Sequence, residues 1–523
     1  MPVHEYLGAV VLEGEAANFP AVAGGESVIY RSPEPEIEIP DVTLTEHVLG
    51  GAVARGEHPA FIDGGTGDVT THADYAANVD AVAALLQTRG IVKGSVVGLV
   101  GPNSAEWGIA YHAILRAGGI VTPMSPILTA QEIGRQVRDS GAGLVIDDPP
   151  TLVGEAVLGA QPEKVDVDPE DLAVLPYSSG TTGLMKGVML THRNLVANIE
   201  QAWNSMPVGP EDTLVGLLPY FHIYGQTVVL NLGLSKGSTI VNMQRFDCEE
   251  LIRIVEDYGV TWLHVAPPVI LQIATTADVE GHDLSKLKLV ISGAAPLDAD
   301  LARRAEERIG APIRQGYGMT ELSPVSHKSR LARVEETPPG SIGALVPNTE
   351  ARLVDPETGE DVPEGEEGEI WIRGPQVMKG YLNNPQATAE IFTDDGWLRT
   401  GDIGRIDENG FFYIVDRLKE LIKYKGYQVA PAELEAVLVS HPQVKDAGVI
   451  GVQNEEGEEF PKACVVVEDG LEGEELMAYV AERVAPYKRV REVEFVEEVP
   501  KSASGKILRR VLRDQHGAAK AAG

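Results

Sequence analysis

The sequence is poor in cysteine. Cys248 and Cys464 are the only two cysteines in 523 residues, and they lie far apart and outside any Cys-x-x-Cys spacing. This pattern excludes a disulfide framework and a cysteine-based zinc site. Because free cysteine is commonly buried, we expect both to be small core residues.

Long hydrophobic runs are also missing. No uninterrupted apolar stretch approaches the roughly 20 residues that span a bilayer. The first residues, MPVHEYLGAVVLEGE, lack the basic segment of a signal peptide, and the last, AAKAAG, carry no peroxisomal or lipidation signal. We therefore expect a soluble cytoplasmic protein without a membrane partner.

Positive charge is scarce. The chain has 43 Lys+Arg against 78 Asp+Glu, a formal net charge of −35. A surface of this sign repels polyanions, so a nucleic-acid partner is not expected. The basic residues of the C-terminal part gather in three islands, residues 419–425, 483–491 and 506–513. These islands are either a solvated face ending in an amphipathic helix (Lys506, Arg509, Arg510 and Arg513 share helical spacing) or a basic surface that closes over an anionic ligand.

The first two-thirds of the chain alternate short apolar runs with helical patterns. Such alternation is typical of α/β proteins, whose sheets are covered by helices on both faces. The pattern predicts buried strands at residues 95–104, 239–243, 261–266 and 288–292, and helices at residues 107–116, 249–258 and 301–309.

The pattern changes after about residue 330. Closely spaced strands and Asp/Gly/Pro turns predict a small antiparallel or barrel-like unit, followed by a compact α+β module. We place the boundary near residue 418, which gives a large N-terminal domain (1–418) and a small C-terminal domain (419–523).

Residues 177–187, YSSGTTGLMKG, form the strongest local signal and are called the phosphate loop below. Glycines let a backbone approach a polyphosphate, hydroxyls donate hydrogen bonds and a lysine offsets charge. The spacing differs from a Walker A loop. The alternative is a flexible Gly/Thr hairpin. The candidate phosphate ligands are Ser178, Ser179, Gly180, Thr181, Thr182, Gly183 and Lys186.

The phosphate loop resembles that of the adenylate-forming superfamily, which includes acyl-CoA synthetases, luciferases and nonribosomal peptide adenylation domains. Four further motifs of that superfamily follow in the expected order: QGYGMTE, GWLRTGD, DRLKELIK and PKSASGK. The resemblance extends from about residue 39 to residue 513. It is most specific to 4-coumarate:CoA ligases, through PYFHIYG, SGAAPLDA, YGMTELSP and VDRLKELIKYKGYQVAPAELE.

The resemblance assigns a nucleotide site. It implies that Glu321 binds Mg²⁺, that Asp402 accepts hydrogen bonds from the ribose hydroxyls and that Arg417 assists at the ribose and phosphate. From the residues alone, Glu321 is otherwise a first-turn helix residue and Asp402 a turn-capping aspartate. The remaining nucleotide contacts implied are Gly293, Ala294, Ala295, Gln315, Gly316, Tyr317, Gly318 and Thr320.

The resemblance also assigns the catalytic groups. It implies that Lys506 is the adenylation lysine. It also implies that the C-terminal domain is a mobile lid, which rotates about Lys419 so that Lys425 and Gly426 replace Lys506 in the thioester step. Further residues are Lys423 and Gln428, near the phosphate or acyl-adenylate, and Arg245, near the CoA phosphate. Without the resemblance, Lys506 and Arg245 are ordinary solvated residues.

The acid pocket follows by the same resemblance. It implies that His222 and Tyr224 lie at the acyl group, with walls from Val228, Ile291, Leu322, Ser323, Pro324 and Val325. Two positions depart from plant 4-coumarate ligases, which often have lysine in place of Ile291 and alanine in place of Leu322. An apolar, shortened pocket of this kind favours cinnamate or 4-coumarate over methoxylated acids, or accepts medium-chain acids.

These features together predict an acid:CoA ligase that uses ATP, Mg²⁺ and coenzyme A and proceeds through an acyl-adenylate. The preferred substrate is 4-coumarate or a related hydroxycinnamate; the alternatives are a medium-chain fatty acid or another aryl acid. More distant alternatives are a luciferase-type oxygenase and an enzyme that loads a carrier protein. The protein is expected to be a monomer or a homodimer.

Overall fold

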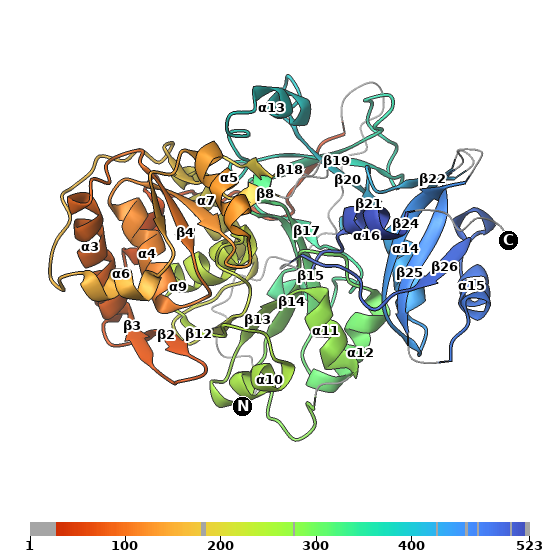
Figure 1. The fold of residues 1–523 in the computed structure, drawn as a ribbon, viewed down its shortest axis with the longest axis horizontal. Coiled ribbons are helices and arrows are strands. Elements are labelled where there is room, and N and C mark those ends of the chain that lie inside the picture. Colours follow the sequence, from red (N-terminus) through yellow and green to blue (C-terminus); the bar gives the residue numbers. More distant parts are fainter. Residues whose placement is uncertain are drawn as a thin grey trace.

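The computed structural model describes residues 28–178, 185–275, 278–424, 427–454, 459–467, 470–502 and 505–517. Helices and sheets alternate through the larger part of the molecule, and the last strands and helices form a separate unit at one side (Figure 1). The α/β fold with a smaller α+β unit, expected from the sequence, is confirmed. The boundary at residue 418 stays a prediction.

A nine-stranded sheet forms the centre of the larger part. Its middle strands are parallel and fully buried, in agreement with their Val/Ile/Leu-rich sequences. In spatial order the strands are β17 (Ala344–Leu345), β16 (Val325–Lys328), β15 (Ile313–Gly318), β14 (Leu289–Ser292), β13 (Trp262–Val265), β11 (Thr213–Gly216), β12 (Thr239–Asn242), β2 (Pro59–Asp63) and β3 (Val69–Thr71).

A second, five-stranded sheet contains the strands that lead to the phosphate loop. In spatial order these are β10 (Leu190–Thr191), β7 (Leu172–Val174), β5 (Ile120–Met124), β4 (Val96–Val100) and β6 (Leu144–Ile146). Beside it lie α3 (His72–Thr88), α4 (Ala105–Arg116) and α7 (His192–Ser205) (Figure 1).

Three helices begin directly after a polar N-cap residue. Ser104, Asp247 and Asp298 accept hydrogen bonds from the first turns of α4, α10 (Cys248–Asp257) and α12 (Ala299–Ile309). The helices therefore start slightly before the predicted bounds. A side-chain oxygen at the N-cap satisfies a backbone N–H that would otherwise lack a partner.

A five-stranded antiparallel sheet forms the barrel-like unit. Its order is β1 (Tyr30–Arg31), β18 (Glu350–Val354), β19 (Gly368–Arg373), β20 (Leu398–Ile406) and β21 (Phe412–Arg417). The chain then enters the β22–β23 hairpin (Ile422–Tyr424 and Tyr427–Val429).

The C-terminal unit has its own core. Its sheet consists of β24 (Val444–Gln453), β25 (Glu459–Val467) and β26 (Glu492–Phe495), packed by α14 (Pro431–Val439), α15 (Gly473–Ala481) and α16 (Arg509–His516). The core residues Leu434, Leu438, Val449 and Leu476 are fully buried. In Figure 1 this unit lies at the right, with α16 against the larger part.

Two expectations need correction. Cys464 is buried as predicted, but Cys248 is only half-buried, because it is the first residue of the surface helix α10. The last helix begins at Arg509 rather than at Lys506, because the chain around Lys506 leaves helical geometry to reach the larger part of the molecule.

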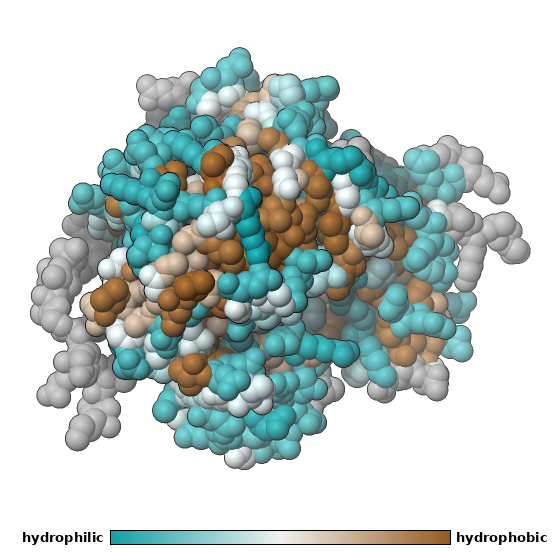
Figure 2. Space-filling view, turned by 60° about the vertical axis from the view of Figure 1, so that its left-hand side comes forward, coloured by the Kyte–Doolittle hydropathy of each residue, from teal (hydrophilic) through white to brown (hydrophobic). Residues whose placement is uncertain are grey.

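One face of the molecule can be described by its hydropathy. Figure 2 shows a mostly hydrophilic face on which hydrophobic residues gather mainly near the middle. Among the described residues, no helix combines the length and the apolar character that crossing a bilayer requires.

Candidate active site

A narrow cavity of about 50 Å³ lies where the ends of the parallel strands of the central sheet meet the C-terminal unit. Its walls come from the ends of β13, β14 and β15, the β15–β16 connection, the segment around α8 (Ile223–Gly225), and one lysine of the C-terminal unit. The lining residues are His222, Ile223, Tyr224, Val228, His264, Ile291, Gly293, Ala294, Gly316, Tyr317, Gly318, Met319, Thr320, Pro324, Val325, Lys328 and Lys506.

Most of the residues predicted to surround the acid therefore line one cavity. Leu322 and Ser323 do not line it. Leu322 is fully buried in the main core, and Ser323 donates its hydroxyl to the Gln376 carbonyl at 2.8 Å. Both follow Glu321 in a tight turn that points them away from the cavity.

Two glycines let the cavity walls come close together. A Cβ at Gly293 would lie 2.8 Å from the Tyr224 ring, and one at Gly318 would lie 2.1 Å from the Pro324 carbonyl oxygen. Gly316 has more room, since the nearest atoms to its Cβ position are at 3.5 and 3.8 Å. The walls thus consist of backbone and ring faces, which suits a flat ligand.

Asp402 joins three strands at the nucleotide side of the cavity. Its carboxylate accepts a hydrogen bond from the Tyr317 hydroxyl at 2.6 Å and pairs with Arg417 Nε at 3.2 Å. Asp402 lies within strand β20, opposite Arg417 in the register, and not in the turn expected from Thr-Gly-Asp. Burial and the neighbouring Asp402 raise the pKa of Tyr317. Asp402 is thus a buried, pre-oriented acceptor.

Glu321 lies where the phosphate loop meets the central sheet. Its Oε1 accepts hydrogen bonds from the Ser178 hydroxyl at 3.2 Å and the Tyr381 hydroxyl at 2.8 Å. Lys186 Nζ lies 4.7 Å from the centroid of the Tyr381 ring. The fold thus brings Ser178, Lys186 and Glu321 together, and adds Tyr381, which the sequence analysis missed.

Lys506 enters the cavity from the C-terminal unit. Burial and the charge of Arg417 lower its pKa to about 8, against the opposing influence of Asp402 and Glu321. Burial and the Lys506 charge lower the pKa of His222 to about 4. His222 is therefore a neutral imidazole beside a cation near physiological pH.

Other predicted residues lie outside this cavity. Arg245 and Lys419 are exposed, and Lys423 and Gln428 face each other across the exposed β22–β23 hairpin. Ala295 follows the lining residue Ala294, and Gln315 uses its side-chain amide to bond Leu297 N–H and the Pro339 carbonyl.

Seven predicted residues lie outside the described residues. They are Ser179, Gly180, Thr181, Thr182 and Gly183 of the phosphate loop, and Lys425 and Gly426 of the hairpin. The described flanks of the phosphate loop, β8 (Tyr177–Ser178) and β9 (Lys186–Gly187), pair antiparallel with Ser178 opposite Lys186.

Four lining residues escaped the sequence analysis: Ile223, His264, Met319 and Lys328. His264 lies inside an apolar run, and Lys328 is the last residue of β16, outside any motif. The sequence offered a signal for His264, a titratable residue within the buried strand predicted at residues 261–266, whereas no strand was predicted around Lys328.

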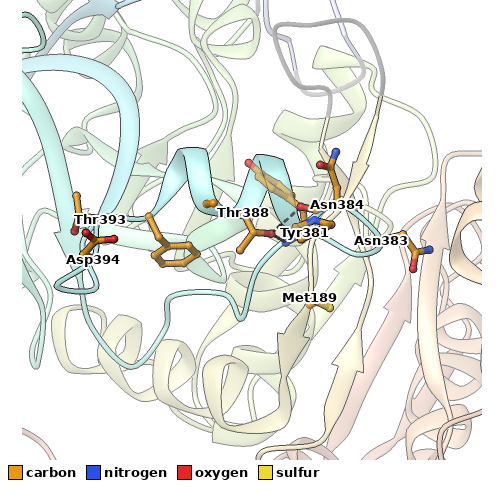
Figure 3. Close-up of a pocket in the computed structure, with 10 residues that line it drawn as sticks. Met189, Tyr381, Asn383, Asn384, Thr388, Thr393 and Asp394 are labelled. Carbon is orange, nitrogen blue, oxygen red and sulfur yellow. Dashed lines mark hydrogen bonds between the residues drawn. The ribbon is translucent and has the colours of Figure 1, made fainter.

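A larger hollow of about 580 Å³ lies beside the site, along α13 (Pro385–Ile391). Figure 3 shows Met189, Tyr381, Asn384 and Thr388 around it, with the Thr388 hydroxyl bonded to the backbone next to it. Among the described residues that line it there is no Lys, Arg or His, and so no cation for a phosphate or a carboxylate.

Comparison with known families identifies both parts of the chain. A family model described as AMP-binding enzyme matches residues 51–382, and one described as AMP-binding enzyme C-terminal domain matches residues 433–506. The curated relative 4-coumarate–CoA ligase 5 of Oryza sativa subsp. japonica is 41% identical over 93% of this chain and 97% of its own length.

Solved structures share the fold over nearly the whole chain. ATP-bound MatB from Rhodopseudomonas palustris is 28% identical with a TM-score of 0.83, covering 91% of this chain and 99% of its own. An anthranilate CoA ligase in complex with anthranoyl-AMP is 25% identical with a TM-score of 0.84, covering 92% and 98%. Both neighbours are described with a nucleotide or an adenylate bound.

Proposed function

The chain belongs to the AMP-binding enzyme family and is an AMP-forming acid–thiol ligase, and we propose that the acid it activates is a hydroxycinnamate such as 4-coumarate. The observation that carries the proposal is the placement of Lys506 and His222 in one narrow cavity with glycine and aromatic walls. A flat aryl acid fits such walls, with its carboxylate toward Lys506.

The first half-reaction is attack of the acid carboxylate on the α-phosphate of ATP, with loss of pyrophosphate. Negative charge develops on the transferring and leaving groups, so positioned cations provide most of the catalysis. Lys506 is such a cation, since its ammonium is desolvated and held by the fold. His222, which is neutral, can donate or accept one hydrogen bond at the carboxyl without repelling ATP.

The nucleotide is proposed to bind between the cavity and the phosphate loop. The Asp402 carboxylate accepts from the ribose hydroxyls, and Arg417 holds that carboxylate in place. Ser178 and Lys186 serve the phosphates, together with the rest of the phosphate loop by resemblance.

The donor set around Glu321 fits Mg²⁺. The two hydrogen bonds that the described residues make to this carboxylate both go to Oε1, which leaves Oε2 for a hard cation. Mg²⁺ commonly takes one or two carboxylates, its remaining ligands being phosphate oxygens and water. When bound there, the ion neutralises charge on the phosphates.

The second half-reaction transfers the acyl group to coenzyme A. By resemblance, the C-terminal unit turns about Lys419, and Lys425 and Gly426 then take the place of Lys506. The same resemblance puts Lys423 and Gln428 near the adenylate. It puts Arg245 near the CoA phosphate. Lys423 and Gln428, which the resemblance puts near the phosphate or the acyl-adenylate, are exposed in the present arrangement.

The proposal is tested by incubating the purified protein with ATP, Mg²⁺, CoA and a panel of acids. The panel contains 4-coumarate, cinnamate, ferulate, benzoate, anthranilate and octanoate. We expect 4-coumarate to give the highest kcat/KM, measured as thioester absorbance. A higher value for octanoate or for a benzoate would overturn the hydroxycinnamate assignment, and transfer only to a carrier protein would overturn the use of free CoA.

Lys506→Ala provides the mechanistic control. We expect this variant to lose ATP–pyrophosphate exchange while it still forms thioester from supplied acyl-adenylate. The matched variant Lys501→Ala removes a lysine of the same loop that pairs with Asp446, and should retain both half-reactions. Equal loss of both half-reactions in Lys506→Ala would contradict the two-step account.

A further inference from the structure

Two buried basic side chains lie in the cavity and have no role in the chemistry proposed above. Lys328, on β16, is 4% exposed, and His264, on β13, is 1% exposed. Both line the cavity that contains His222 and Lys506. Lysine and histidine are rarely buried to this extent without partners.

Within the described part of the chain, His264 has no hydrogen-bond partner for its ring and Lys328 has a single weak one. Both ring nitrogens of His264 are without a hydrogen-bond partner among the described residues. Lys328 Nζ donates one long hydrogen bond, of 3.5 Å, to the Ala202 carbonyl, and among the described residues no carboxylate forms an ion pair with it. Buried polar groups left in this state cost free energy until something binds them.

The charges of the two groups are linked. Burial lowers the pKa of Lys328 to about 7. Burial and the neighbouring Lys328 charge keep the pKa of His264 well below its usual value. Near neutral pH the imidazole is therefore uncharged and can accept a proton in a hydrogen bond, while the lysine is partly charged and donates.

The basic groups of the cavity form two separate pairs. Burial and then the Lys506 charge lower the pKa of His222, whereas burial and then the Lys328 charge lower the pKa of His264. Lys506 also interacts with Arg417, Asp402 and Glu321, which places its pair at the nucleotide. The second pair lies deeper in the sheet, since Lys328 is opposite Gly316 whereas Val325 is opposite Gly318 near the turn.

The wall between the two pairs is apolar and flat. His264 and Ile291 are register partners on adjacent strands, and the Tyr224 ring meets the His264 ring edge-on at 6.0 Å. The open Cβ position at Gly316 lies 3.8 Å from Ile291 Cγ2. An acid held by its carboxyl at Lys506 would thus direct its other end along this wall to Lys328 and His264.

We propose that Lys328 and His264 together determine acid specificity by binding a phenolic hydroxyl at the end of the acid remote from its carboxyl. The Lys328 ammonium donates to the phenol oxygen, and the phenol O–H donates to a ring nitrogen of His264. This inference rests on the proposed function, because it requires that the acid is aromatic.

A phenol fits the pair better than a second carboxylate. The phenol is neutral, so it adds no charge to be desolvated at the buried end of the cavity, whereas a carboxylate would. It also offers one donor and one acceptor, and so satisfies both side chains at once. An acid that ends in hydrocarbon leaves both unpaired, and sites built for a hydrogen bond discriminate strongly against such analogues.

The test compares 4-coumarate, cinnamate and 4-carboxycinnamate in the full-length enzyme and in Lys328→Met and His264→Phe. These variants keep side-chain volume and remove the polar atoms. We expect wild type to prefer 4-coumarate over cinnamate by about tenfold or more in kcat/KM. Each variant should reduce that ratio toward 1, mainly by losing activity on 4-coumarate. Lys236→Met removes a partly buried lysine, which pairs with Glu200 away from the cavity, and should leave the ratio unchanged.

Several results would overturn the inference. An equal loss on 4-coumarate and cinnamate in Lys328→Met would show a structural role, and a wild-type preference for 4-carboxycinnamate would show an anion site. Calorimetric binding of the three acids keeps the test independent of turnover and of variant activity. If wild type converts none of them, the proposed function fails; the specificity inference fails only if binding also shows no preference for the phenol.

Discussion

Lys506 shows how a single residue acquires its chemistry from its surroundings. In the sequence it precedes Ile-Leu-Arg-Arg and has the character of a solvated helix residue. In the structure it lies in a cavity beside Arg417, and both burial and that guanidinium favour the uncharged amine. A lysine with a lowered pKa at a phosphoryl-transfer site is a functional feature rather than a surface one.

The pH dependence of adenylation follows from this pKa. The role proposed for Lys506 requires its charged form, which is present below about pH 8 and lost above it. We therefore expect kcat/KM for ATP–pyrophosphate exchange to fall about tenfold per pH unit above pH 8, since kcat/KM reports the pKa of the free enzyme.

Lys506→Arg is the control for this profile. A guanidinium stays protonated at all accessible pH values, so the variant should lose the alkaline decline even if its maximal rate is lower. A wild-type profile that stays level to pH 10 would show that the charge of Lys506 does not limit the step.

At the scale of elements, a largely buried ion pair connects parts of the C-terminal unit. Arg509 of α16 contacts Glu435 of α14 at 2.7 and 3.2 Å, and Glu435 also accepts the Val449 N–H of β24 at 2.8 Å. Burial raises the pKa of Glu435, against the opposing charge of Arg509. The pair therefore connects two helices and a strand through one buried carboxylate, which would destabilise the unit if it had no charged partner.

Arg509→Met should destabilise the C-terminal unit by about 3 kcal/mol, because it leaves the buried Glu435 carboxylate without its partner. Urea unfolding followed by hydrogen exchange in α14 and β24 would measure the loss. The neighbouring Arg510 is exposed, so Arg510→Met should change stability by no more than about 0.5 kcal/mol. Similar effects of both substitutions would rule out the specific role of the pair.

At the scale of the whole molecule, the proposal that the C-terminal unit changes position between the two half-reactions can be tested through its present contacts. Lys506 reaches the cavity because Gly505, at φ +81°, packs against Ala266 and Pro268 of the larger part. A Cβ at Gly505 would lie 3.3 Å from the Ala266 Cβ, close to the separation that a disulfide requires.

A disulfide between Ala266→Cys and Gly505→Cys should hold the enzyme in this arrangement. We expect the oxidised double variant to form acyl-adenylate but to lose thioester formation by about 100-fold or more, and to recover it on reduction. Gly505→Cys alone measures the effect of a side chain at a left-handed position. Thioester formation at the wild-type rate in the oxidised enzyme would show that one arrangement serves both steps.

The sequence by itself determined the α/β fold and the order of the motifs, whereas the residues at the nucleotide side came from the resemblance to adenylate-forming enzymes and stay predictions. The fold follows from local patterns: buried strands rich in Val and Ile, polar caps, and glycines at the close approaches of Gly293 and Gly318. Only the tertiary structure placed Tyr381 on Glu321, directed Leu322 and Ser323 away from the cavity, and set Lys328 beside His264. The physical reason is that burial and charge depend on contacts between strands distant in sequence, which no local pattern records.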